Sequence, residues 1–243
     1  DLTLGAGRSI GVVGRTGSGK TTFSRLVLRL VETTAGTVNL GGVPIADIPI
    51  AELRRRTALV PQEVELFNAS VRDNVTLFDN SVSDERVLEA LDRVGLGHVA
   101  DGGIDRPLGG GGAGLSAGES QLLALARVWL TDPDLVVLDE ATARVDPETE
   151  ARLDTAVREL MRGRTTIVIA NRLSTLREVD DIVVFEAGRV VEHGARDQLA
   201  ADPTTRFHRL LAVGLEPAHD GRARPTPGTG IGLSDGREED LLA

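Results

Sequence analysis

Apolar, β-branched runs alternate with amphipathic segments along most of the chain. Residues 8–14 form such a run and end in glycine, which predicts a buried strand. From Gly19 onward, apolar residues recur at three- and four-residue spacings up to Leu30, which predicts a helix with one buried face. The same two patterns recur downstream, as strands at 57–60, 135–138, 165–170 and 182–185 and as helices that open at Ser83, Ser116 and Asp146. Strands that alternate with helices predict an α/β fold with a mostly parallel core sheet.

Two regions depart from this alternation. Residues 37–45 contain two short extended runs around a pair of glycines, which predicts a small antiparallel β edge. Between about 70 and 131 the strand pattern stops, and we expect a helical subdomain there. Within it, Ser116 and Glu119 have the spacing of a capping box, in which serine and glutamate side chains satisfy backbone N–H groups at the start of a helix.

The two ends of the chain differ from its body. The chain begins at Asp1 rather than at methionine, and the next three residues resemble the end of a strand, so we expect the small β edge to be truncated at its N-terminal side. From Leu215 onward, glycine, proline and charged residues follow one another without periodicity. We therefore expect one domain over residues 1–214 and a flexible tail over 215–243.

Composition narrows the classes of function. The 243 residues are 41% hydrophobic and 26% charged, which is enough apolar material for a sizeable core. The 27 basic and 37 acidic residues give a formal net charge of −10, which argues against nucleic acid as the main partner. The absence of cysteine excludes a disulfide framework, a zinc ribbon and a thiol nucleophile. No apolar stretch approaches the roughly 18 residues that a membrane-spanning helix needs.

The strongest chemical signal is a glycine-rich loop between the first strand and the first helix. It matches G-x-x-x-x-G-K-[ST], the pattern of a phosphate-binding loop, and its lysine is the only one in the chain. The glycines let backbone N–H groups turn toward a phosphate, the lysine adds positive charge, and the threonine hydroxyl ligates Mg²⁺. The sequence therefore predicts that nucleotide phosphates are bound by Gly14, Arg15, Thr16, Gly17, Ser18, Gly19, Lys20, Thr21 and Thr22, with Thr21 also a metal ligand.

Two carboxylates follow the apolar strand at 135–138. The end of a parallel strand is where open α/β sheets bind ligands, so we expect Asp139 to hold Mg²⁺, through water, and Glu140 to act as general base toward the attacking water. The alternative is an ordinary solvated strand end. The phosphate-binding loop favours the functional interpretation.

Further motifs occur in a fixed order along the chain. Gln62 follows the strand at 57–60, residues 115–119 have the sequence Leu-Ser-Ala-Gly-Glu, and Asp139-Glu140-Ala141-Thr142 is followed by Asp146. With these motifs the chain resembles the nucleotide-binding domain of ATP-binding cassette (ABC) transporters, most closely those of exporters, over about residues 1–212. The family signature is usually LSGGQ, so Ala117 and Glu119 are departures from it, whereas Ser116 and Gly118 match.

The resemblance implies a P-loop NTPase that binds ATP and Mg²⁺ and hydrolyses ATP to power export of an unknown substrate. It implies a head-to-tail dimer in which Ser116 and Gly118 contact the ATP held by the phosphate-binding loop of the partner subunit. Gln62 would then be a metal ligand and catalytic residue that senses Mg²⁺ and the lytic water. Transmembrane domains outside this chain would hold it at the cytoplasmic face of the cell membrane.

One departure bears on activity. The family carries a histidine after the strand that matches 165–170, and Asn171 stands at that position here. An asparagine amide can still donate a hydrogen bond to a γ-phosphate oxygen, but it is shorter and cannot become charged. We therefore expect Asn171 to contribute to catalysis at a slow site, in an asymmetric pair of domains with a heterodimer favoured over a homodimer.

Two alternatives remain open from the sequence. The chain could be a regulatory, degenerate-site subunit that binds ATP with little hydrolysis, which Asn171 favours and Glu140 disfavours. It could also be a DNA-repair or translation ATPase built on the same cassette. The net charge and the absence of a coiled-coil insertion or basic arm disfavour that second alternative.

Overall fold

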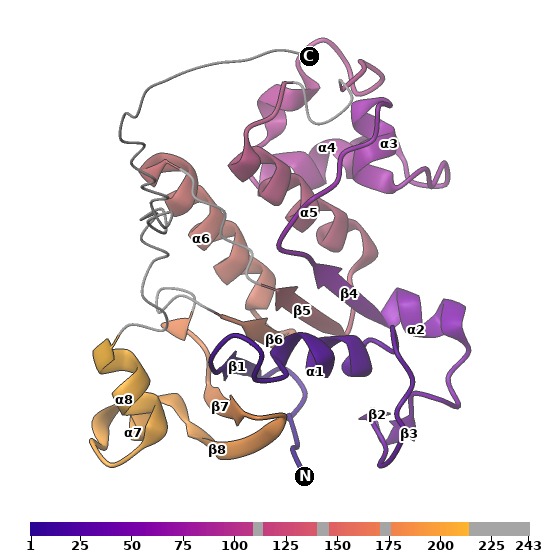
Figure 1. Cartoon of the computed structure of the whole chain (residues 1–243). Helices are drawn as coiled ribbons and strands as arrows, with labels where there is room; N and C mark the ends of the chain where they lie inside the picture. Colours follow the sequence, from indigo (N-terminus) through magenta and orange to yellow (C-terminus); the bar gives the residue numbers. More distant parts are fainter. Residues whose placement is uncertain (109–113, 140–145, 171–175, 214–243) are drawn as a thin grey trace, which may run out of the picture.

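The computed structural model describes residues 1–108, 114–139, 146–170 and 176–213. A six-stranded sheet with the order β4-β5-β6-β1-β7-β8 forms its centre (Figure 1). All neighbouring strands are parallel except β7 and β8, so the predicted mostly parallel α/β sheet is confirmed. The strands of this sheet are β1 (Ser9–Val13), β4 (Thr57–Val60), β5 (Leu135–Asp139), β6 (Thr165–Ile169), β7 (Asp181–Glu186) and β8 (Arg189–Ala195).

The central strands are buried on both faces, as is usual in parallel sheets, because most of their residues are apolar. In β5, Val136 and Leu138 pack into the cluster formed with the two long helices α5 and α6. Leu135 and Val137 pack into the cluster on the opposite face, which includes Leu28 at the end of α1. The sheet is therefore the middle layer of a helix–sheet–helix sandwich.

Some helices pack against the two faces of the sheet, and most of the others form a separate group (Figure 1). α3, α4, the 3-10 turn η1 and α5 occupy the chain between β4 and β5, where the sequence predicts helices without strands. The helices are α1 (Lys20–Val27), α2 (Ile50–Arg56), α3 (Val71–Thr76), α4 (Asp84–Arg93), η1 (Gly97–Ala100), α5 (Ala117–Thr131), α6 (Pro147–Met161), α7 (Arg196–Ala201) and α8 (Arg206–Val213).

The register of the parallel strands aligns their carboxyl ends. Val60 pairs with Leu138, Asp139 pairs with Ile169, and Val12 pairs with Ile169 from the other side. The segments that leave β1, β4 and β5 therefore start from one edge of the sheet. This is the edge at which open α/β sheets bind ligands.

Two local predictions are confirmed with a difference in detail, and one, the extent of the first helix, is wrong. The predicted small antiparallel edge is confirmed, but it is reduced to β2 (Asn39–Leu40) and β3 (Val43–Pro44). α1 ends at Val27 because Arg29 adopts a left-handed backbone, and Leu30 is 50% exposed rather than on a buried helix face. Ser83 does occupy the N-cap of α4, but its side chain accepts no bond from the helix backbone.

Some predicted features fall outside the described residues, namely Glu140, Asn171 and the tail over 215–243. The boundary at 214 and the helical subdomain as a unit stay predictions. Within the described part of the chain, no helix has the length and apolar character needed to cross a membrane.

Candidate functional site

The phosphate-binding loop leaves β1 with a backbone that only glycine adopts easily. Gly14, Gly17 and Gly19 have φ angles of 152°, 78° and 106°. A Cβ atom at Gly14 would lie 2.4 Å from the carbonyl oxygen of Phe185, whereas one at Gly17 would meet nothing within 4 Å. The first glycine is therefore required by close packing on β7, and the second by backbone conformation alone.

Lys20, the first residue of α1, is 7% exposed and lies within this loop. Its Nζ donates to the carbonyl oxygen of Gly14 at 2.6 Å and lies 3.4 Å from that of Arg15. The loop is also tied to the turn after β7, since the Gly188 amide donates to the carbonyl oxygen of Ser18 at 2.9 Å. The only lysine of the chain is thus held as a buried positive charge at the start of a helix, where the helix dipole adds to it.

Asp139 ends β5 on the side of the sheet that α1 covers. Burial raises the pKa of its carboxyl group, and the positive charges of Lys20 and Arg25 oppose that rise. The electrostatic influence of Lys20 shows that the carboxylate lies near the phosphate-binding loop. A desolvated carboxylate whose charge is only partly compensated is a suitable ligand for a cation.

The predicted metal ligands Thr21, Gln62 and Asp139 offer a hydroxyl, an amide oxygen and a carboxylate. These hard oxygen donors suit Mg²⁺, which is held through one or two carboxylates together with water and substrate phosphates. In the described ranges no group of three His, Cys, Asp or Glu side chains could hold a metal by itself. The residues present therefore fit a Mg²⁺ ion that is bound together with a nucleotide, rather than a dedicated protein metal site.

The loop that carries Gln62 is fastened to α5 by two polar side chains. Gln121 is 2% exposed, and its Nε2 donates to the carbonyl oxygen of Gln62 at 2.7 Å. Arg127, two turns further along α5, donates from Nε to the carbonyl oxygen of Asn74 at 2.8 Å and from Nη2 to that of Glu65 at 3.2 Å. Burial lowers the pKa of the Arg127 guanidinium. The backbone position of Gln62 is thus set by the helix that begins at Ser116.

Asn74 braces the same loop from α3. It is fully buried, its Oδ1 accepts from the Phe67 amide at 2.7 Å, and its Nδ2 donates to the carbonyl oxygens of Phe67 at 2.9 Å and Ser70 at 3.0 Å. A buried amide side chain with its donors and acceptor satisfied fixes the loop geometry strongly.

The first turn of α5 has the predicted capping box. Ser116 Oγ accepts from the Glu119 amide at 3.2 Å, and Glu119 Oε2 accepts from the Ser116 amide at 2.8 Å. Within the described part of the chain, the amides of Ala117 and Gly118 carry no hydrogen bond, as is usual for the first turn of a helix. They are donors available to an anion, and Ser116 and Gly118 lie where the resemblance assigns contact with the ATP of a partner subunit.

The structure thus brings the phosphate-binding loop and Asp139 together, and it leaves Ser116 and Gly118 on a separate element. Sequence reasoning missed Gln121, Arg127 and Asn74 as residues that support the site. The available signal was polarity inside an apolar helix, since Gln121 and Arg127 flank a run of buried residues in α5. Asn74 gives no such signal because it lies in a short, mixed helix.

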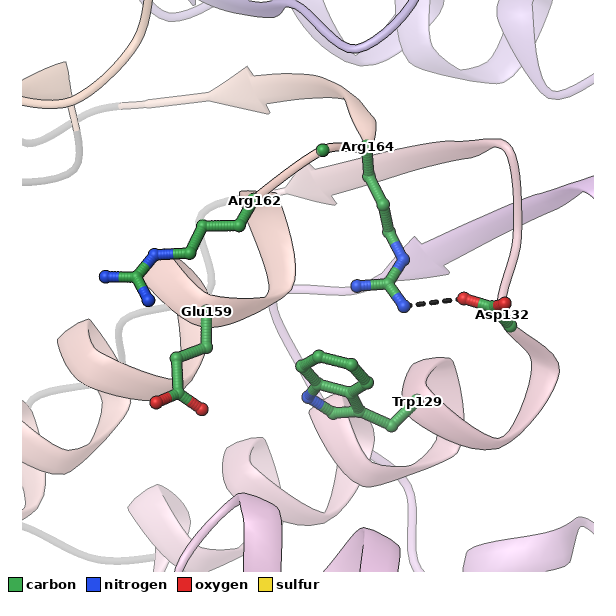
Figure 2. A pocket seen from close by; sticks show the side chains of 6 residues that line it. Trp129, Asp132, Glu159, Arg162 and Arg164 are labelled. Atoms are coloured by element: carbon green, nitrogen blue, oxygen red, sulfur yellow. Dashed lines mark hydrogen bonds and ion pairs between the residues drawn. The ribbon is translucent and has the colours of Figure 1, made fainter.

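A second hollow lies away from this site, at the ends of α5 and α6 (Figure 2). Trp129 is partly buried there and packs against the main core cluster. Its ring has the guanidinium carbons of Arg93 and Arg164 at 4.7 and 4.4 Å from the ring centroid. Arg164 also pairs with Asp132 at 2.6 Å, as the dashed line in Figure 2 shows. This cluster connects the end of α4, the end of α5 and the residue that precedes β6.

The curated relatives are similar to this chain over most of its length. The ATP-dependent lipid A-core flippase of Chromobacterium violaceum is 43% identical over 224 residues, which are 90% of this chain and 38% of the flippase. The uncharacterized ABC transporter ATP-binding protein YknV of Bacillus subtilis is 39% identical over 204 residues, which are 82% of this chain and 34% of that protein. The chain therefore spans little more than a third of the length of these relatives.

A solved structure agrees with the sequence relatives. The structure of a bacterial Atm1-family ABC exporter with ATP bound superposes with a TM-score of 0.78 and 31% identity, over 87% of this chain and 38% of the other. The family model described as ABC transporter matches residues 1–143. With the sheet order, the phosphate-binding loop and these matches in agreement, the chain belongs to the ABC transporter family, as an ATP-binding domain of the kind found in its exporters.

Proposed function

We propose that this chain is the ATP-binding and hydrolysing module of an ABC exporter and acts at the cytoplasmic face of the cell membrane. It works as one of two such modules, fused to or paired with transmembrane domains outside the chain. ATP binding draws the two modules together, and hydrolysis lets them separate. The transported substrate is chosen by the transmembrane domains.

The observation that carries this proposal is the placement of Lys20 and Asp139. A buried lysine at the start of α1 and a desolvated carboxylate at the end of β5 flank one glycine-rich loop. The lysine and the loop amides suit the phosphates of ATP, and the carboxylate suits the accompanying cation. When bound, Mg²⁺ neutralises charge on the phosphate oxygens.

We assign the reaction itself to three further residues. Glu140, directly after Asp139, orients and deprotonates the attacking water as general base. Gln62 contacts the cation and the same water, and Asn171 donates a hydrogen bond to the γ-phosphate. ATP lies on Gly14–Thr22 of one subunit, while Ser116 and Gly118 of the other subunit cover its γ-phosphate.

An exposed apolar surface next to the Gln62 loop is the docking surface we assign to the transmembrane partner. Phe67, Leu77 and Phe78 are 41%, 53% and 51% exposed, and the rings of Phe67 and Phe78 meet edge to face with centroids 5.3 Å apart. Leu77 and Phe78 both adopt left-handed backbone conformations, which bulky residues adopt only at a cost. Clustered exposed apolar side chains are typical of interaction sites.

The test is ATP turnover by the complete transporter with its natural partner subunit, comparing wild type with Glu140→Gln. ATP occupancy is measured in parallel, and Glu148→Gln, an exposed glutamate at the start of α6, is the matched control. Turnover that falls at least tenfold in Glu140→Gln, with ATP still bound and the control unchanged, supports hydrolysis at this site. Unchanged turnover in Glu140→Gln with ATP bound would contradict it.

Asn171 favours a second candidate function, that of a regulatory subunit which holds ATP for long periods while its partner performs most turnover. On this account Asn171→His accelerates ATP turnover at this site, because it supplies the longer, chargeable side chain. Equal turnover before and after Asn171→His would remove the basis for an asymmetric, heterodimeric pair.

A further inference from the structure

A hydrogen bond between two side chains joins the first turn of α5 to η1. His98 Nε2 lies 3.0 Å from Glu119 Oε1, while the other oxygen of the same carboxylate accepts the Ser116 amide at 2.8 Å. The Glu119 side chain is 21% exposed and that of His98 is 52% exposed. One carboxylate thus connects a histidine to the residue that caps α5.

The charge of Glu119 conflicts with the role proposed for this helix end. An anion is to approach the amides of Ala117 and Gly118, yet a carboxylate already lies within the same turn. Two negative groups near one helix start repel each other unless a positive charge intervenes. Burial raises the pKa of Glu119, and the hydrogen bonds from Ser116 and His98 outweigh it, so that the pKa is lowered and the group is held in its charged form.

We propose that His98 is a positioning residue for ATP-driven closure: when protonated, it holds the Glu119 carboxylate in the capping box and neutralises it, so that Ser116 and Gly118 can receive the γ-phosphate of the ATP bound to the partner subunit. This inference rests on the proposed function. It predicts that closure in this protein needs less ATP at pH 6 than at pH 8, and that this difference depends on both His98 and Glu119.

Other charged groups lie around η1 but act elsewhere. Asp92 of α4 lies against Gly97, Arg106 donates from Nε to the carbonyl oxygen of Val99 at 2.7 Å, and Arg152 of α6 binds the carbonyl oxygen of Gly95. Asp101 follows η1 directly. Among the described residues, His98 is the charged group whose Coulombic effect lowers the pKa of Glu119.

The experiment measures closure of the complete transporter against ATP concentration at pH 6 and pH 8. Closure is followed by the distance between spin labels on the two nucleotide-binding domains in a Glu140→Gln background, so the readout does not depend on turnover. Variants are His98→Gln, Glu119→Gln and their combination, with His193→Gln as the control for an exposed histidine elsewhere. Because ATP itself titrates in this range, each profile is compared with those of the variants.

We expect wild type to require about two- to fivefold less ATP at pH 6 than at pH 8, beyond the change seen in His98→Gln. Glu119→Gln should remove this extra pH dependence, and adding His98→Gln to it should change nothing further. A purely structural role of His98 would instead shift closure equally at both pH values. A wild-type profile equal to that of His98→Gln would overturn the inference, whereas failure of wild type to close with ATP at either pH would overturn the proposed function.

Discussion

The side-chain amide of Gln121 holds the backbone carbonyl of Gln62 at 2.7 Å, although the two residues lie 59 positions apart in the chain. Gln121 comes just over one turn after the capping serine of α5, and Gln62 lies in the loop that leaves β4. The proposed partner-facing end of the domain and its own proposed metal ligand are therefore fixed to the same helix.

Gln121→Leu tests this attachment. Leucine preserves most of the volume but removes the donor, so we expect the Gln62 loop to shift and ATP turnover by the transporter to fall roughly 10- to 100-fold, with ATP binding to the phosphate-binding loop maintained. Steady-state turnover and nucleotide binding are measured side by side. Gln198→Leu, at an exposed position on α7, is the control. Equal loss in both variants would show that Gln121 has no special effect on the site.

Asn74→Leu tests the brace on the other side of that loop. The change removes the acceptor of the Phe67 amide and one hydrogen bond to each of the carbonyl oxygens of Phe67 and Ser70, which keep their bonds from the Ala69 and Asn74 amides. We expect the free energy of unfolding to fall by about 3 kcal/mol, measured by urea denaturation. Asn68→Leu, on an exposed residue of the same loop, should cost less than about 0.5 kcal/mol. Similar costs at the two positions would contradict the bracing role.

The hydrogen bonds of Asp180 lead to a prediction of how the stability of the fold depends on pH. Its Oδ2 accepts from the Ser9 amide at 2.7 Å and the Ser9 hydroxyl at 2.8 Å, and these bonds lower the pKa of Asp180. A lowered folded-state pKa contributes stability above the unfolded-state value of about 3.9, and this contribution is lost as the pH falls through the folded-state value. Asp180→Asn should therefore lower the denaturation midpoint at pH 7, with the difference from wild type shrinking below about pH 4. A difference that is constant from pH 7 to pH 3, or that also appears in the exposed Asp47→Asn, would refute this assignment.

The arginine contacts of Trp129 can be tested by its own fluorescence, since it is the only tryptophan of the chain. Arg164→Leu removes the guanidinium 4.4 Å from the ring centroid and the ion pair with Asp132. We expect a loss of about 1–2 kcal/mol in the free energy of unfolding and a shifted emission maximum. Arg162→Leu changes an exposed arginine of the same hollow (Figure 2) and should do neither.

Local patterns were enough to predict most strands of the main sheet and the longer helices. The apolar strand at 135–138, the capping box at Ser116 and the start of α6 at Asp146 depend on neighbours within a few residues, and the structure confirms all three. The glycine-rich loop was predictable for the same reason. Its φ angles are consequences of its own residues.

The supporting contacts were not predictable because they join distant segments. Nothing near Gln121 in the sequence indicates that its amide meets residues 61 and 62, and the partners of Arg127 lie 53 and 62 positions away. The hydrogen bond of His98 with Glu119 likewise depends on how η1 packs beside α5. Such contacts follow from strand order and helix packing, which periodicity does not specify.

The alternation of side chains in β5 decides which carboxylate meets the lysine. Leu135 and Val137 face the layer that contains α1, Val136 and Leu138 face the layer that contains α5, and Asp139 follows in the first series, toward Lys20. Deleting a single residue anywhere in this strand would exchange the two series and direct the aspartate to the opposite side. The loops around the site can therefore change in length over evolution. The number of residues in β5 is constrained, because it sets the side of the sheet that Asp139 faces.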